Sequence, residues 1–250
     1  MTKKSLRNIK ISLLVLVSCS PMISYASDSE QLKVGLNYSL DFQQYKGKKT
    51  TSSLLPVVFY DNQKQYIEGS ELGLYLLNDD KNQLRLNAYY DGSYFEPSGA
   101  VSALKTRKWS VMSGASYMRI TPFGGFKAQI GTDILSRSKG TVATLSYLAE
   151  LDIDKWSIYP EIGYQWNDRK YNQYYYGVSQ SEAENSGLSV YTPKDSIQPY
   201  ASLNFNYDLT KTWNIVGGVD INYLSKQQYN SPMVKNHFDI SPSLGFLFKF

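Results

Sequence analysis

The last thirteen residues, Phe238 to Phe250, place an apolar side chain at every second position. Counted back from the carboxyl end, one face holds Phe, Phe, Phe, Leu, Pro, Ile and Phe, and the other face is mostly small or polar. Because a β-strand directs successive side chains to opposite faces, this segment is predicted to be a strand with one apolar face. A strand of about 10 residues with this pattern is long enough to cross a bilayer when it is tilted.

The same alternation recurs along the chain, at residues 32–43, 83–91, 126–134, 143–151, 156–166, 197–208 and 213–223. A soluble sandwich would also alternate, with its polar face in solvent. Aromatic residues at strand ends distinguish the two architectures: Trp156 and Trp166 bracket one run, and Trp213 and Tyr223 bracket another. Amphipathic rings gather in this way at the two interfaces of a membrane. The pattern therefore predicts an all-β fold, a closed antiparallel transmembrane β-barrel.

The number of strands follows from the positions of the chain ends. Eleven candidate strands can be counted, but a barrel with both ends on one side of the membrane needs an even number. The alternation breaks within residues 50–80, so we expect a hidden strand there and twelve strands in total, with ten as the alternative. The short connections 152–156 and 208–213 are predicted to be periplasmic turns. The long segments 95–107, 168–196 and 226–237 are then extracellular loops.

The amino-terminal segment has the organisation of a secretory signal. A basic start is followed by the apolar run Ile11 to Val17, which is too short for a transmembrane helix. Ser24-Tyr25-Ala26 resembles a signal peptidase site, so residues 1–26 are predicted to be removed and 27–250 to form the barrel. In the alternative interpretation, the segment ending in Cys19 is a lipobox and Cys19 carries the lipid.

The carboxyl-terminal Phe250, together with Phe248 and Phe246, resembles the assembly signal of bacterial outer-membrane β-barrels. With the signal segment, it predicts a protein that is exported and inserted into the outer membrane of a Gram-negative cell. Outer-membrane lipid is then the first expected partner.

Composition excludes several classes of chemistry. The surplus of basic residues lies wholly in 1–26, which leaves 22 residues of each sign in the mature chain, so its charge predicts no nucleic-acid binding. The one cysteine also lies in that segment. The one histidine, His237, lies between Asn236 and Asp239; some outer-membrane enzymes use such a histidine, but a loop residue without a catalytic task is the simpler interpretation. We expect no catalytic residue, no metal site and no cofactor.

The polar face of the predicted strands carries charges of both signs at mid-strand. They are Arg85, Lys127, Asp133, Glu150, Glu161 and Asp220. In a barrel of twelve strands these side chains point into a lumen that is much narrower than that of a 16-stranded porin. Opposite charges in a narrow lumen tend to pair, and the pattern therefore argues against a wide open pore.

One loop segment has a local pattern of its own. Ser179 with Glu182 forms a capping box, an acidic residue lies in the first turn, and Gly187 stands where a helix ends. Residues 179–186 are therefore predicted to form a short helix, with Leu188 folding back. The helix either constricts the barrel mouth or only stabilises the loop.

This loop also carries a family resemblance. The sequence YYGVSQSEAENSGLSVY (175–191) is similar to the signature of the MipA/OmpV family of outer-membrane proteins. The residues that carry the match are Tyr176, Gly177, Val178, Ser179, Glu182, Ser186, Gly187 and Leu188. Residues 54–77, 207–224 and 230–236 match in the same order. The loop at 44–50 departs from the family pattern, because it lacks an acidic residue, and a contact that needs this acid is in doubt.

The resemblance implies a non-enzymatic protein. Some members are described as scaffolds that bring a murein-cleaving lytic transglycosylase together with a bifunctional murein synthase. Others are described as porin-like or linked to osmotic or antibiotic response. The expected function is therefore a murein-enzyme scaffold, with a small-solute channel as the alternative.

Overall fold

The computed structural model describes residues 32–47 and 50–250. The predicted signal segment 1–26 and Cys19 lie outside the described residues. The described strands are β1 (Lys33–Phe42), β2 (Thr50–Asp61), β3 (Gln65–Glu68), β4 (Glu71–Asn78), β5 (Asn82–Asp91), β6 (Ser110–Thr121), β7 (Gly124–Asp133), β8 (Thr141–Leu148), β9 (Leu151–Ile153), β10 (Trp156–Asn167), β11 (Ser196–Asp208), β12 (Trp213–Tyr223) and β13 (Phe238–Lys249).

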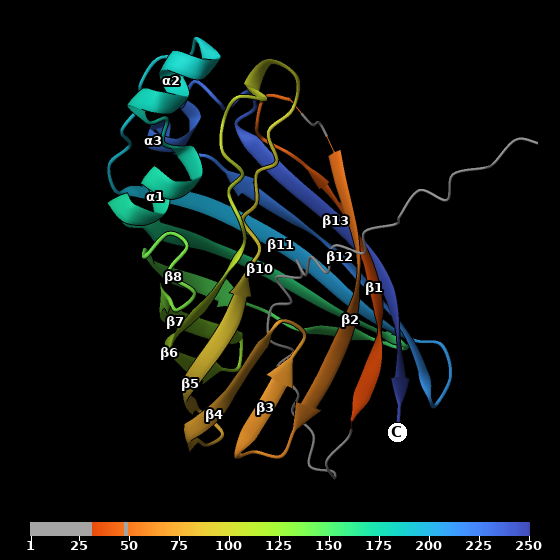
Figure 1. Ribbon diagram of the computed structural model, residues 1–250. Helices are drawn as coiled ribbons and strands as arrows, with labels where there is room; N and C mark the ends of the chain where they lie inside the picture. The colour runs from red at the N-terminus through yellow and green to blue at the C-terminus, as the bar shows by residue number, and fades with distance from the viewer. Residues whose placement is uncertain (1–31, 48–49) are drawn as a thin grey trace, which may run out of the picture.

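All of these strands belong to one antiparallel sheet that closes on itself (Figure 1). Apart from β8 and β9, each strand pairs with the next along the chain, and β13 pairs with β1 from Lys249 opposite Lys33 to Ile240 opposite Phe42. β8 and β9 pair with different parts of β10 and are two pieces of one wall strand. The described residues therefore form a closed barrel of twelve strands, which confirms the predicted fold class and strand number.

The break between β8 and β9 has a local cause. Ala149 N donates to Pro160 O at 3.0 Å, but Pro160 has no N–H to return the second bond of the pair. Proline interrupts a ladder at such a position.

The hidden strand of residues 50–80 is β3. It has only four residues. It pairs with β2 over Phe59–Asp61 and with β4 over Glu71–Leu74. A run this short shows too little alternation to be recognised in the sequence. Its presence brings the wall to twelve strands and leaves β2 much longer than its neighbour, as Figure 1 shows.

The two faces of the wall have the predicted character. Apolar side chains on the outer face are strongly exposed, as in Leu54 (61%), Leu145 (65%) and Ile162 (61%). Leu55 and Leu247, on the inner face, are fully buried. Within residues 32–47 and 50–250, no helix is long and apolar enough to cross a membrane.

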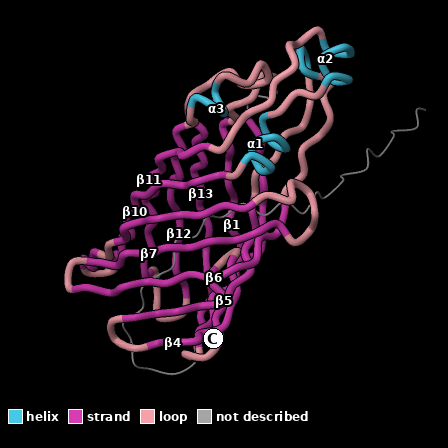
Figure 2. The backbone as a smooth tube through the Cα atoms, turned by 90° about the vertical axis from the view of Figure 1, so that its left-hand side faces the viewer, coloured by secondary structure: helices cyan, strands magenta, loops and turns pink. Residues whose placement is uncertain are grey.

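The two ends of the barrel differ. One end, called the loop end here, carries the segments 43–47, 92–109, 134–140, 168–195 and 224–237. It also carries all described helices: η1 (Gly99–Val101), α1 (Arg169–Tyr176), α2 (Gln180–Ser186) and α3 (Lys226–Tyr229), of which the three α-helices are labelled in Figure 2. The opposite turn end carries short hairpin connections and the carboxyl terminus (Figure 1). The predicted loops and turns thus fall on opposite ends.

Candidate functional site: the lumen and its cap

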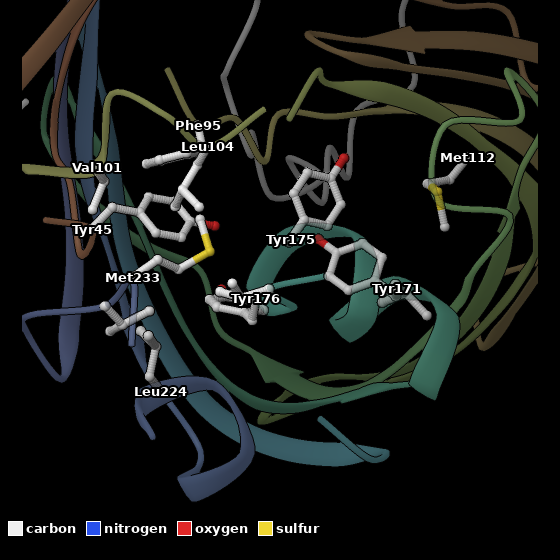
Figure 3. Close-up of a cluster of buried hydrophobic side chains, with 13 residues drawn as sticks. Tyr45, Phe95, Val101, Leu104, Met112, Tyr171, Tyr175, Tyr176, Leu224 and Met233 are labelled. Carbon is white, nitrogen blue, oxygen red and sulfur yellow. The ribbon is translucent and has the colours of Figure 1, made fainter. Parts of the chain in front are cut away.

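A cluster of buried apolar side chains covers the lumen at the loop end. We call it the cap; its buried members are Tyr45, Phe95, Val101, Leu104, Met112, Val142, Tyr171, Tyr175, Tyr176, Val178, Leu224, Met233 and Val234. In Figure 3, three tyrosines from α1 lie inside the ring of strands. The cap thus draws on every long loop, and the loops pack as one unit over the lumen.

Helix α1 is the part of the cap that sequence reasoning missed. Asp168 caps its first turn by accepting a hydrogen bond from Tyr171 N at 2.7 Å. The Tyr171 hydroxyl contacts Ser93 Oγ at 2.6 Å, and the Tyr175 hydroxyl donates to Lys108 O at 3.1 Å. These bonds tie α1 to the segment 92–109.

Helix α2 confirms the predicted loop helix. Ser179 is its N-cap in a complete capping box with Glu182, and Gly187 ends it in the left-handed conformation, at φ 73°. Ser186 Oγ donates to Glu182 O at 2.6 Å, and Leu188 packs against the cap. The helix lies above α1, farther from the lumen (Figure 1). The constricting element over the mouth is therefore α1 rather than α2.

Glu182 performs a second task besides capping α2. Its carboxylate accepts hydrogen bonds from Arg107 Nη2 at 2.8 Å and from Lys105 N at 3.0 Å. The two side chains of the ion pair are only 7% and 5% exposed. Burial by itself raises the pKa of the Glu182 carboxyl, but the surrounding backbone and guanidinium donors outweigh it and lower the pKa to about 2.

The other residues of the loop motif complete this joint. Tyr176 and Val178 are buried in the cap. Gly177 ends α1, and its carbonyl accepts from Arg107 Nη2 at 3.1 Å. The motif thus joins the loop 168–195 to the segment 92–109. These contacts within the loop end explain why the motif has this combination of residues.

Below the cap, two ion pairs lie on the inner face of one side of the wall, between β3 and β7. Arg85 Nη1 lies 3.1 Å from Glu68 Oε2, and its guanidinium lies over the rings of Tyr66 and Tyr75, at 4.5 and 4.9 Å. Arg85 is 3% exposed. A second pair joins Lys127 Nζ to Glu71 Oε2 at 3.7 Å. Both cationic residues were predicted to face the lumen, but their partners lie on or beside β3, the strand that was not recognised.

The predicted acidic residues fall into two groups. Glu161, which accepts from the Tyr200 hydroxyl at 2.7 Å, and Asp220 line the lumen as predicted. Asp133 does not lie at mid-strand: at the loop end of β7, it accepts bonds from Ser138 N at 2.6 Å and from other donors of the 134–140 loop. The predicted mid-strand position of Glu150 is also wrong, because this residue lies in the break between β8 and β9.

A cavity of about 280 Å³ lies between the cap and the lumen ion pairs. Its ionisable lining residues are Asp41, Glu71, Asp91, Lys127, Glu161, Asp220 and Asp239. Its aromatic lining residues are Tyr89, Tyr90, Tyr94, Tyr171, Tyr176 and Tyr200. This volume is well above the roughly 10–15 Å³ that a single water needs. The cavity has a polar, aromatic wall that suits a small ligand.

His237 has a packing role in the loop end. Its ring stacks on that of Tyr229, with centroids 3.3 Å apart, and faces that of Tyr223 at 5.5 Å. The part of the chain that the structure describes holds no group of three or more His, Cys, Asp or Glu residues placed to bind a metal ion.

The proposed assembly residues lie at the turn end. Phe250 is 74% exposed, and its backbone N donates to Leu32 O at 3.0 Å. Phe246 and Phe248 contact the ring of Trp213, with centroids 5.8 and 5.1 Å away. The terminal strand therefore ends in an aromatic group on the outer face.

Comparison with known proteins places this barrel among outer-membrane proteins. It is 32% identical to MltA-interacting protein of Escherichia coli K12 over 244 residues, which cover 96% of this chain and 98% of the relative. It is 27% identical to the putative outer membrane protein YiaT of the same strain, over 92% of this chain and 95% of the relative.

Among solved structures, the COG4313 outer membrane channel from Pseudomonas putida F1 aligns with a TM-score of 0.48 and 10% identity, over 92% of this chain and 100% of the channel. The NanC porin aligns with a TM-score of 0.42 and 12% identity, over 89% and 100%.

The family model described as MltA-interacting protein MipA matches residues 32–250, which is the whole of the barrel. The relatives are named outer membrane proteins, and the closed barrel is of the outer-membrane type. The chain therefore belongs to the MipA family of outer-membrane β-barrel proteins.

Proposed function

We propose that this barrel is a non-enzymatic scaffold that holds a lytic transglycosylase of the MltA type at the periplasmic side of the outer membrane. The observation that carries the proposal is the 32% identity, over 96% of the chain, to a relative named MltA-interacting protein. A bifunctional murein synthase is the second proposed partner, and it completes the scaffold that the family resemblance implies.

The closed lumen supports a scaffold over a conducting pore. The buried cap covers the loop end, and the ion pairs of Arg85 and Lys127 lie on the inner face of the wall beneath it. A channel, the alternative function, is favoured by the cavity of about 280 Å³. For solute to pass, however, the cap would have to move.

The proposed binding surface is the periplasmic rim, defined as the connections 62–64, 79–81, 122–123, 154–155 and 209–212. Side chains fix these turns; Asp79 Oδ1, for example, accepts from Lys81 N and Asn82 N, both at 2.8 Å. Lys64, Asp79, Lys155 and Lys211 are exposed on four of the turns. A rigid rim lowers the ordering cost of binding.

The test is a binding measurement between the barrel in lipid nanodiscs and a purified MltA-type lytic transglycosylase. Charge reversals at the rim (Lys64→Glu, Asp79→Lys, Lys155→Glu and Lys211→Glu) are compared with deletion of residues 177–190 at the loop end. We expect at least one rim reversal to weaken binding tenfold or more and the loop deletion to leave it unchanged. Absence of binding by the unmodified barrel, or loss of binding only on loop deletion, would refute the proposal.

A further inference from the structure

One strand edge in the barrel wall is left without a partner. β3 pairs with β2 only over Phe59–Asp61, and the next bond toward the loop end runs from Gly69 N to Val58 O at 2.9 Å. In an antiparallel ladder the polar groups of every second residue point to the same neighbour. The backbone groups of Pro56, Leu54 and Ser52 therefore point to this edge, where none of them has a backbone partner among the described residues.

The unpaired edge of β2 faces a gap in the wall, which is bounded on its far side by β5 and at the loop end by the cap. Tyr90 N donates to Ser70 O at 3.0 Å, after which β5 continues into the segment 92–109. Above the gap, the rings of Tyr45 and Phe95 lie 4.8 Å apart within the cap. We call this gap the lateral window: it is bounded by residues 50–57, the turn 69–70, residues 91–94 and the cap.

The outer face beside the lateral window is apolar, as expected of a face in contact with lipid. Leu54 is 61% exposed on the outer face, and Phe42, which pairs with Thr50 at the top of β2, is 44% exposed there. Unpaired backbone at membrane depth is tolerated only where it is buried in protein or lines a water-filled cavity. Pro56 has no N–H, so this edge carries one donor fewer, as is usual for proline on an unpaired edge. The window is therefore built as a wetted opening.

The lumen cavity reaches the lateral window. Its lining includes Ser70, Gly92 and Tyr94 at the window as well as residues of the far wall. Asp41 also lines it and stands opposite Thr51 in the β1–β2 register, at the height of the window. A molecule that enters from the side would meet this part of the cavity first.

The cavity wall has many more carboxyl groups than basic groups. Among the described residues that line it there are six carboxyl groups and one ammonium group, that of Lys127. Asp41 and Asp239 lie diagonally across the β1–β13 pair, in which Phe42 stands opposite Ile240, and their carboxyl groups interact with each other. The Oδ1 atom of each is buried without a hydrogen-bond donor among the described residues. Two such acceptors side by side call for a donor between them.

We propose that the lateral window admits a membrane-borne amphipathic amine, whose ammonium group binds between Asp41 and Asp239 while its apolar tail extends through the window. The ammonium donates hydrogen bonds to the Oδ1 atoms of Asp41 and Asp239. It also adds a positive charge to a wall in which Lys127 is the one basic group among the described lining residues. The tyrosine rings around the cavity suit an organic cation, because aromatic faces attract positive charge. The tail leaves along Leu54 and Pro56 toward lipid. This site is independent of the periplasmic rim.

The test uses Trp109, whose ring lies 5.2 Å from that of Tyr90 in the cavity wall. A protein that keeps only this tryptophan (Trp156→Phe, Trp166→Phe, Trp213→Phe) is placed in phospholipid nanodiscs and titrated with a primary dodecylammonium brominated on the third carbon of its chain. Its head group carries N–H donors, and its bromine is a contact quencher that lies close to the head group. The sulfate with the same brominated chain is the matched probe. A protein that keeps only Trp213, at the turn end, reports simple partition into the bilayer.

We expect saturable quenching of Trp109 by the ammonium, with a midpoint at least tenfold lower than that of the sulfate, and unsaturated quenching of Trp213. Asp41→Asn with Asp239→Asn should raise the ammonium midpoint at least tenfold, whereas Asp79→Asn at the turn end should not change it. If the double variant does not fold, the single variant Asp239→Asn is titrated in its place. Equal quenching of both tryptophans, or of Trp109 by both probes, would overturn the proposal. So would an unchanged midpoint in the aspartate variants, which would mean that the two carboxyl groups only share a proton.

Discussion

Replacing Glu182 with Gln should open the cap without unfolding the barrel. The change keeps the side-chain shape but removes the charge that pairs with Arg107 at 2.8 Å, in a pair whose side chains are 7% and 5% exposed. Removing one partner of a buried ion pair costs about 3–5 kcal/mol, because the other charge is left buried and unpaired. At 1.4 kcal/mol for each factor of ten, the population of the open cap should rise at least about a hundredfold.

Hydrogen exchange followed by mass spectrometry measures this effect directly. Peptides that cover 95–108 and 177–190 should exchange at least about a hundredfold faster in Glu182→Gln, while peptides from β10 and β11 stay protected. The matched control is Glu184→Gln on the same helix, because Glu184 is exposed and bonds only locally, to Gln180 Nε2 at 2.8 Å. Equal exchange in the two variants would refute the view that this ion pair holds the cap.

Three further predictions concern the cap and the chain end. Because the pKa of Glu182 is about 2 in the folded cap and about 4.3 in an unfolded chain, its stabilising effect is complete above about pH 4.3 and is lost as the pH falls toward 2. Hydrogen-exchange protection of 177–190 between pH 7 and 2 checks this, and loss near pH 6 would implicate another group. Asp168→Ala should destabilise α1 by about 0.5–2 kcal/mol, seen as faster exchange of 169–176 and not of α2; no change would mean that the cap bond to Tyr171 N is dispensable. Deletion of Phe250 should lower outer-membrane levels in cells but leave refolding in detergent near normal, and an equal loss in both assays would make the residue merely structural.

The wall of the barrel was largely predictable from sequence because its rule is local. Each long strand shows a period of two, and a lipid-facing strand cannot hide its apolar positions. β3 escaped because four residues, Gln65–Glu68, are too few to establish a period. Its loss had a consequence in the lumen: the partners of Arg85 and Lys127, which are Glu68 and Glu71, could not be assigned.

The loop end was predictable only where a local motif exists. The capping box of Ser179 and Glu182 and the ending Gly187 identified α2. Helix α1 has an N-cap too, Asp168, but its tyrosines gave no apolar face that the sequence alone could assign to a partner. That partner is the rest of the cap, which is assembled from segments far apart in the chain. Tertiary packing of this kind leaves no local signal.

Single-channel conductance of the refolded mature barrel tests most directly whether the cap closes the lumen. Planar bilayers containing the unmodified protein should show no stable conductance steps. The barrel with residues 177–190 deleted should stay silent as well, because α1 lies over the mouth and keeps its own bonds to the segment 92–109, from Tyr171 to Ser93 and from Tyr175 to Lys108. Steady ohmic steps from the unmodified protein would contradict the closed lumen and favour a small-solute channel.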